Sequence, residues 1–314
     1  MDPEMTCGGT IRSVWVVLAL GAGSADLLPA QEEAVGLIVD TFCADLDGGT
    51  GGVSVDNDGV VYVADFGSIL SDPETMGTRV FRITSDGDAE VFASGLKGAS
   101  GNEFDSEGNL FQSNIRGNFI SKIAPDGTWS EFARDGIEGP VGIVIDEDDV
   151  LFVANCHGNT VRRVTPAGGS SVFAQDPLLK CPNGITMDED HNLYVANFDN
   201  GDVLKIARDG GVSRLATVPG GNNGHLVYHQ GSLYVVARGS HRIYRVTLAG
   251  EIEVFAGTGK RGRDDGPALE ATFSYPNDID VGPDGSFYVN EIAATNGPHT
   301  NLAPMVVRRI RAAP

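Results

Sequence analysis

A hairpin-like motif recurs six times along this chain, and the repeat constrains the fold more than any other feature. Each copy has an alternating apolar strand, an Asp/Gly-rich turn and a second strand with aromatic or β-branched residues. The first copy, residues 52–65, reads GVSVDNDGVVYVAD. The others span residues 101–114, 142–155, 184–197, 224–237 and 278–291. This regularity, together with 42 glycines and 15 prolines, predicts a single all-β domain with many hairpins.

Further strands follow each hairpin. A third apolar strand recurs at residues 79–83, 119–123, 161–164, 203–206, 243–246 and 306–310. A fourth follows in the first five copies, with endings such as Val-Phe-Ala at residues 91–93, 172–174 and 254–256. Six repeats of four strands predict a six-bladed β-propeller over residues 31–314, with blades starting near residues 51, 100, 141, 183, 223 and 277.

The sixth repeat lacks its fourth strand, and residues 37–42 look like a fourth strand without a blade. We predict that this N-terminal strand completes blade six and closes the ring, which removes the open edges of the array. Three connections are unusually long: residues 66–78, 257–275 and 292–304. The strand directions place all three on the top face around blades five, six and one. We expect them to cover a functional mouth of the channel; flexible decoration is the alternative.

The formal net charge is -21, which disfavours nucleic acid and anionic membrane surfaces as partners. We expect a small-molecule substrate or ligand, and the charge favours a cation or a neutral or cationic ligand. Arg12 precedes an apolar run at residues 14–23, and small residues follow. This pattern is typical of a signal peptide within residues 1–30 and predicts a secreted or periplasmic protein; the run is too short to span a bilayer. A disordered, buried or interfacial N-terminal segment is the alternative.

Two of the four cysteines fall in predicted loops on one face of neighbouring blades. Cys156 follows the second strand of blade three, and Cys181 precedes the first strand of blade four. In an oxidising compartment they are expected to form a disulfide, and two reduced, half-buried thiols are the alternative.

Two segments carry a family resemblance. Residues 182–197, PNGITMDEDHNLYVAN, resemble the repeat of the gluconolactonase and senescence marker protein superfamily. Residues 254–259, VFAGTG, and the segment that continues to residue 279 resemble an NHL repeat. The resemblance implies a six-bladed propeller whose members include lactonases, strictosidine synthase-like enzymes and binding domains. In the gluconolactonase-like enzymes the channel rim holds a divalent metal through a Glu, one or more Asn and an Asp.

Three neighbouring blades place amides at this predicted rim: Asn183, Asn223 and Asn277. Amide oxygens suit Ca²⁺, so a divalent cation, with Ca²⁺ favoured, is the predicted cofactor. Asn183 matches a family ligand, but Gly51 stands where the resemblance implies Glu. The second strands end at the same face, which makes Asp65, Glu291 and Asp278 the candidate carboxylates. Turn-capping of nearby backbone amides is the alternative role for them.

A rim metal would polarise a carbonyl and activate water, leaving a carboxylate or histidine to move the proton. The predicted catalytic residues are Glu291, Asp65 and His225, with His157 and His299 as further histidines near the mouth. The leading hypothesis is a metal-assisted hydrolase of lactones or esters. The alternatives are a non-catalytic binding propeller for a protein, glycan or small ligand, and a metal-independent lyase or strictosidine synthase-like enzyme that uses Glu291.

Overall fold

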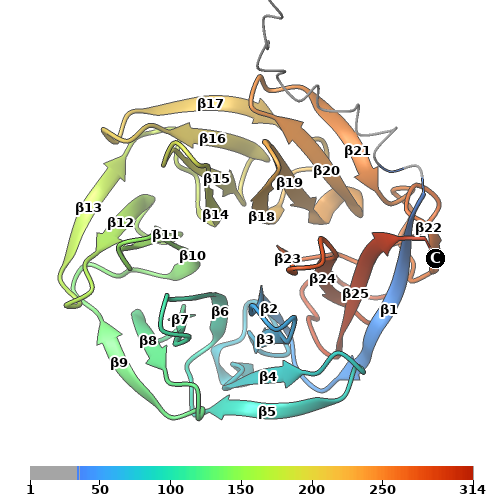
Figure 1. Ribbon diagram of the computed structural model, residues 1–314, viewed down its shortest axis with the longest axis horizontal. Coiled ribbons are helices and arrows are strands. Elements are labelled where there is room, and N and C mark those ends of the chain that lie inside the picture. Colours follow the sequence, from blue (N-terminus) through green and yellow to red (C-terminus); the bar gives the residue numbers. More distant parts are fainter. Residues whose placement is uncertain (1–33, 35, 314) are drawn as a thin grey trace, which may run out of the picture.

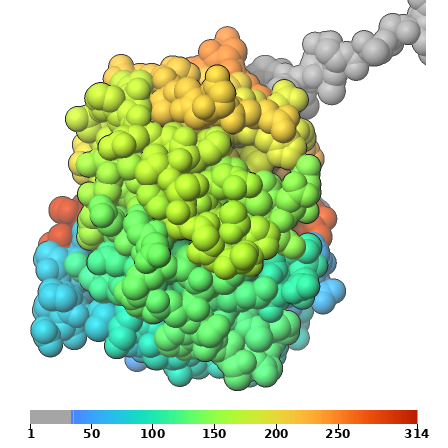
Figure 2. Space-filling model, turned by 90° about the vertical axis from the view of Figure 1, so that its left-hand side faces the viewer, coloured from blue at the N-terminus to red at the C-terminus, as the bar shows by residue number. Residues whose placement is uncertain are grey.

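The chain forms a ring of six antiparallel sheets around a central channel, as the repeat predicts (Figure 1). The computed structural model describes residue 34 and residues 36–313; the predicted signal segment lies outside this part of the chain. Within each blade the strands are hydrogen-bonded in sequence order, and the first strand lies innermost. Figure 2 views the ring from the side, where consecutive blades succeed one another from green to yellow.

The blades share one pattern of four short strands, and their bounds follow. Blade one contains β2 (Thr50–Val55), β3 (Val61–Asp65), β4 (Arg79–Ile83) and β5 (Ala89–Ser94). Blade two contains β6 (Ala99–Phe104), β7 (Leu110–Asn114), β8 (Phe119–Ile123) and β9 (Trp129–Ala133). Blade three contains β10 (Pro140–Ile145), β11 (Leu151–Asn155), β12 (Thr160–Val164) and β13 (Ser170–Gln175). Blade four contains β14 (Pro182–Met187), β15 (Leu193–Asn197), β16 (Asp202–Ile206) and β17 (Val212–Thr217).

The last two blades border the long connections. Blade five contains β18 (Asn223–His229), β19 (Ser232–Ala237), β20 (Arg242–Thr247) and β21 (Ile252–Ala256). Blade six contains β23 (Asp278–Val281), β24 (Phe287–Ile292), β25 (Met305–Ala312) and β1 (Leu37–Leu46), with the short β22 (Gly266–Pro267) at its edge. Two single-turn 3₁₀ helices, η1 (Pro73–Thr75) and η2 (Arg238–Ser240), interrupt the top loops. No helix in the described part of the chain is long and apolar enough to cross a membrane.

The acidic hairpin turns explain why each repeat folds back on itself. In blade one, Asp56 Oδ1 accepts hydrogen bonds from the backbone N–H groups of Asp58 (3.0 Å) and Val60 (2.9 Å). Gly59 adopts φ +79°, which closes the turn at little steric cost. Asp146 and Asp188 accept the equivalent bonds in blades three and four. These aspartates are therefore turn residues on the face opposite the long loops.

The N-terminal strand closes the ring, which confirms the sequence prediction. β1 pairs antiparallel with β25, for example Val39 with Ile310, and so supplies the missing fourth strand of blade six. The observed strand runs to Leu46, four residues beyond the predicted end. Asp40 Oδ2 forms ion pairs with Arg309 (3.0 Å) and Arg311 (2.7 Å) on the neighbouring strand. Figure 1 shows β1 beside β25 in this blade.

The three long connections contact one another, as the strand directions predict. We call residues 66–78, 257–275 and 292–304 the top-loop cluster. Leu70 N donates to Thr300 O (2.9 Å), and Leu302 N donates to Ser68 O (2.9 Å). The Arg261 side chain donates to carbonyl groups of the third segment.

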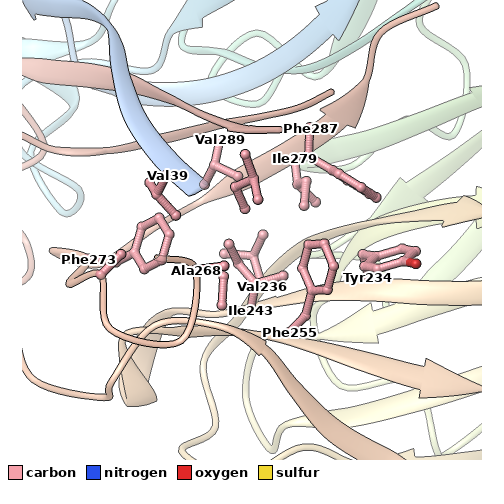
Figure 3. Close-up of a cluster of buried hydrophobic side chains, with 13 residues drawn as sticks. Val39, Tyr234, Val236, Ile243, Phe255, Ala268, Phe273, Ile279, Phe287 and Val289 are labelled. Atoms are coloured by element: carbon pink, nitrogen blue, oxygen red, sulfur yellow. The ribbon is translucent and has the colours of Figure 1, made fainter. Parts of the chain in front are cut away.

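Burial of apolar side chains anchors the second segment of the cluster between blades five and six. Phe273, which is 0 % exposed, and Ala268 pack with Val39 of β1, Phe255 of β21 and Val289 of β24 (Figure 3). The same side chains thus join the ring closure to the top-loop cluster. Burial of these apolar side chains stabilises the position of residues 257–275.

Candidate functional site

A pocket of about 360 Å³ lies at the top mouth of the channel, against the top-loop cluster. Rim residues of several blades line it, including Ser100, Val141, Asn183 and Asn277. Apolar side chains make up much of the remaining lining, as in most small-molecule sites. They are Phe66, Leu70, Ile115, Phe198 and Leu302.

His225 lines this pocket and is held from below by Asp278. Its Nδ1 lies 3.2 Å from Asp278 Oδ2, and both residues are buried. The Asp278 oxygens also accept the backbone N–H groups of Val53 (2.8 Å) and Ile279 (2.7 Å), which fix the carboxyl group. A Cβ on Gly101 would lie 2.9 Å from His225 Cε1, so the glycine makes room for the ring. The sequence-predicted His225 and Asp278 therefore form one pair.

Burial controls the protonation of this pair. Burial, together with the smaller effect of the nearby Arg238 guanidinium, lowers the pKa of His225 to about 3. Burial also raises the pKa of Asp278 well above the ordinary carboxyl value, against the backbone hydrogen bonds that favour the charged form. Both shifts disfavour charge. The low pKa keeps the His225 imidazole neutral. When Asp278 is ionised, it accepts the single imidazole proton at Nδ1, and Nε2 can then act as a base.

Arg238 is a buried charged residue of the pocket, and it was not among the residues predicted from the sequence. It follows β19 directly, is 3 % exposed, and donates from Nη1 to Asn277 Oδ1 (2.8 Å). Asn277 Nδ2 in turn donates to Gly51 O (2.8 Å) in the neighbouring blade one. Asn277 thus connects blade six to blade one and orients the guanidinium.

The predicted amide trio is only partly brought together. Asn183 and Asn277 line the pocket, whereas Asn223 is fully buried outside its lining. Asn183 Nδ2 donates to Asn223 O (3.0 Å), so this amide connects blades four and five. Neither side-chain polar atom of Asn223 has a hydrogen-bond partner within the described chain.

The charges around these amides bear on whether they can hold a divalent cation. The Asn277 oxygen already faces the Arg238 guanidinium, and a positive charge there repels a cation. Asp199 is the carboxylate that lines the pocket, and within the described chain no three His, Cys, Asp or Glu side chains form a group that could hold a metal. The Arg238 charge therefore disfavours a divalent cation at Asn277, and metal titration is the test of the Ca²⁺ prediction.

The two predicted catalytic carboxylates lie outside the pocket lining. Asp65 Oδ1 accepts the N–H groups of Gly49 (2.9 Å) and Gly67 (3.1 Å), and its Oδ2 pairs with Arg79 (3.0 Å). These contacts match the alternative role for Asp65, which is to cap nearby backbone amides. Glu291 is fully buried and pairs with Arg308 at 2.6 Å. Burial raises the pKa of Glu291 to about 7 in spite of that guanidinium.

The remaining predicted top-face residues are distributed around the mouth. Cys156 and Cys181 form a disulfide that lines the pocket, so the first of the two alternatives is confirmed. The disulfide joins blade three to the loop that leads to Asn183. His157 also lines the pocket, whereas His299 packs its ring at 5.8 Å from Tyr275 in the top-loop cluster.

Comparison with known proteins identifies the family. The sequence profile described as the virginiamycin B lyase family matches residues 73–296. The chain belongs to this family. No curated protein matches its sequence.

Solved structures agree with this lyase-family assignment at the level of the fold. Virginiamycin B lyase from Staphylococcus aureus is 16% identical with a TM-score of 0.59, over 87% of this chain and 98% of that one. A catalytically inactive histidine-to-alanine variant of that lyase, solved with quinupristin, is 15% identical with a TM-score of 0.60, over 87% and 99% of the two chains. A gluconolactonase from Xanthomonas campestris is 15% identical with a TM-score of 0.65, over 87% and 88%. A nidogen/laminin complex contains a chain that is 16% identical with a TM-score of 0.58, over 70% and 93%.

The repeat register of this lyase-family propeller could have revealed the residues that sequence reasoning missed. The residue that directly follows the predicted end of each second strand points to the pocket side in most blades. At this position stand Phe66, Ile115, Cys156, Phe198, Arg238 and Ile292. The first five line the pocket, and Ile292 packs with Phe66 and Ile115 in one buried cluster. The predicted carboxylates Asp65 and Glu291 stand at the strand ends, one position too early, and in a strand this places the side chain on the other face.

Proposed function

We propose that this protein is a metal-independent acid–base enzyme of the lyase type, with His225 as the residue that moves the proton. The observation that carries the proposal is that His225, which lines the pocket of a chain from a lyase family, is paired with the buried Asp278. Glu291, which the sequence predicted for this role, faces Arg308 instead. His225 therefore replaces it in the proposed mechanism.

The proposed reaction is an elimination next to a carbonyl group. His225 Nε2 takes a proton from the carbon next to the carbonyl, and the electron pair of that C–H bond forms a C=C bond as the leaving group departs with its own pair. The leaving group takes up the proton, so no water is consumed. Asp278 holds the Nδ1 side of the ring and stabilises the imidazolium that forms. General acid–base catalysis of this kind contributes roughly 10²- to 10⁴-fold in rate.

Metal-assisted hydrolysis of a lactone or ester is the second candidate. The presence of Asn183 and Asn277 in the pocket, and the fold shared with a gluconolactonase, support it. The Arg238 guanidinium beside Asn277 favours the metal-independent mechanism. A third outcome is ligand binding without turnover.

Product analysis separates these functions. Quinupristin and a panel of lactones and aryl esters would be incubated with chelator-treated protein, with and without Ca²⁺. Elimination that opens a ring gives a product of unchanged mass with a new C=C absorbance, whereas hydrolysis adds one water. We expect elimination without Ca²⁺, lost in His225→Asn and retained in His191→Asn, a histidine on the opposite face of the ring. Hydrolysis that requires Ca²⁺ and fails in Asn183→Ala would establish the second candidate.

We also propose that the protein is exported. The Cys156–Cys181 disulfide supports this, because such bonds persist in oxidising compartments. Expression with the native N-terminus, followed by N-terminal sequencing of the mature chain, tests it. Recovery of the unprocessed chain from the cytoplasm would contradict the proposal.

A further inference from the structure

Arg238 differs from the other arginines in the protein interior by its lack of a counterion. Three arginines are buried in the described part of the chain. Arg308 pairs with Glu291 at 2.6 Å, and Arg245 lies 3.9 Å from Glu253. Arg238 has no carboxylate partner among the described residues, and its hydrogen bond goes to the neutral Asn277. Burial lowers the pKa of Arg238 to about 10, which reflects the unfavourable desolvation of the charge.

The repeat shows that this charge is not needed to build the pocket. At the five equivalent positions stand uncharged residues, and they are Phe66, Ile115, Cys156, Phe198 and Ile292. An apolar side chain is thus compatible with this place in a blade. A buried, uncompensated guanidinium at the sixth position is a local exception.

The pocket around Arg238 has the opposite character to the protein as a whole. The chain carries a net charge of -21, from which a cationic or neutral ligand was expected. The pocket lining instead contains two arginines, Arg238 and Arg116, with Asp199 as its carboxylate. Apolar side chains such as Leu70 and Leu302 complete the lining. This combination suits a ligand with an apolar body and one anionic group.

We propose that Arg238 is the anion-binding residue of this pocket and that the ligand carries a carboxylate group attached to an apolar body. A carboxylate supplies the counterion that the protein lacks, and its planar oxygens match the guanidinium fork. The inference rests on the proposed function in one respect: the same pocket is the active site, and the carboxylate defines its substrate class. Arg238 is a binding residue in this scheme, and His225 remains the residue that moves the proton.

Calorimetric titration of the full chain tests the inference with a matched pair of probes. 3-Phenylpropanoate carries the carboxylate, and 3-phenylpropanamide is its neutral counterpart of similar shape. We expect the wild type to bind the carboxylate at least about tenfold more tightly than the amide, as for hydrogen bonds to charged groups. Arg238→Met should weaken carboxylate binding by about 10- to 100-fold and leave amide binding unchanged. Its melting temperature should equal or exceed that of the wild type, because an unpaired buried charge has been removed.

Two further arginine variants act as controls. Arg245→Met removes a buried arginine that has a carboxylate partner; it should lower the melting temperature and keep the carboxylate preference. Arg116→Met removes the half-buried arginine of the pocket and should keep most of the preference. Absence of a preference in the wild type, or its survival in Arg238→Met, would overturn the inference. Loss of the preference in Arg116→Met alone would overturn it in favour of Arg116.

The design separates this inference from the proposed function. If His225→Asn loses turnover and keeps the carboxylate preference, both proposals stand. If the wild type eliminates a neutral substrate and shows no carboxylate preference, the function stands and the inference fails. If the carboxylate preference is present and His225→Asn turns over at the wild-type rate, the inference stands and the proposed function fails.

Discussion

The ion pair between Arg308 and Glu291 allows a quantitative test of how the top-loop cluster is held. Both side chains are 0% exposed, and Nη1 lies 2.6 Å from Oε1. The other guanidinium nitrogen, Nη2, pairs with Asp265 in the cluster at 2.7 Å, and Nη1 also donates to Thr272 O (3.2 Å). Arg308→Met would therefore remove the connection between β25 and the loop while it keeps a side chain of similar length.

The expected cost follows from the burial of the pair. Removing one partner of a buried ion pair destabilises a protein by about 3–5 kcal/mol, since the other charge is left uncompensated. The half-exposed Asp265 adds less than about 1 kcal/mol. At roughly 2 °C for each kcal/mol in a chain of this size, the melting temperature should fall by about 6–10 °C.

The cost of Arg308→Met should rise with pH. The folded-state pKa of Glu291, about 7, already lies above the ordinary glutamate value, and loss of Arg308 raises it further. In the variant the folded state then binds more protons than the unfolded state, so its stability falls as the pH rises through this range. At pH 6 Glu291 is protonated, which relieves much of the loss in the free energy of unfolding caused by Arg308→Met. Toward pH 8 this loss grows by up to about 1.4 kcal/mol per pH unit.

Urea unfolding at pH 6 and pH 8, followed by intrinsic fluorescence, measures these differences. Glu291→Gln removes the charge but keeps an oxygen for the Ser274 N–H, and should cost less than Arg308→Met at pH 8. Arg82→Met, which breaks an exposed pair with Glu90, should cost less than about 1 kcal/mol. A loss below about 1 kcal/mol for Arg308→Met at pH 8 would refute the reasoning. So would a Glu291→Gln variant of full stability that loses turnover, since Glu291 would then be catalytic.

Three other predictions concern the ring. Deletion of residues 1–42 should remove most of β1, open blade six and lower the melting temperature relative to a chain that lacks residues 1–30; equal melting temperatures would refute the closure argument. Cys156→Ser should cost about 3 kcal/mol in urea unfolding under oxidising conditions and nothing after reduction, because the disulfide closes a loop with a sequence separation of 25. Burial raises the pKa of Glu103 and of Asp280 in the channel, and repulsion by Asp280 raises that of Glu103 further. The native state therefore retains a proton that the unfolded state releases above about pH 4, and stability falls as the pH rises toward neutral. Asp280→Asn should flatten that dependence in unfolding measurements from pH 5 to pH 8; an unchanged slope would contradict the assignment.

The candidate site was predictable only in part, and particular residues show why. His225 was identifiable because it lies next to the rim position of blade five, and its pairing with Asp278 depends on a neighbouring blade. Asp65 and Glu291 were assigned to the mouth because their strands end there, yet each faces an arginine, Arg79 or Arg308. The side-chain direction at a strand end depends on such partners. No sequence motif identifies Arg238. Its proposed role in anion binding follows from the lack of a carboxylate partner among the described residues around it.

The sequence alone determined the six blades, the closure by the N-terminal strand and the face on which the long loops gather. These features follow from local alternation, turn residues and the requirement that a repeat array leave no open edge. Only the tertiary structure decided which polar residues share a pocket. Burial, hydrogen-bond partners and charge balance at the mouth arise between blades that are far apart in the chain. The buried guanidinium of Arg238 lies beside a neutral Asn277 from the next blade. This contact cannot be predicted from the sequence of either blade.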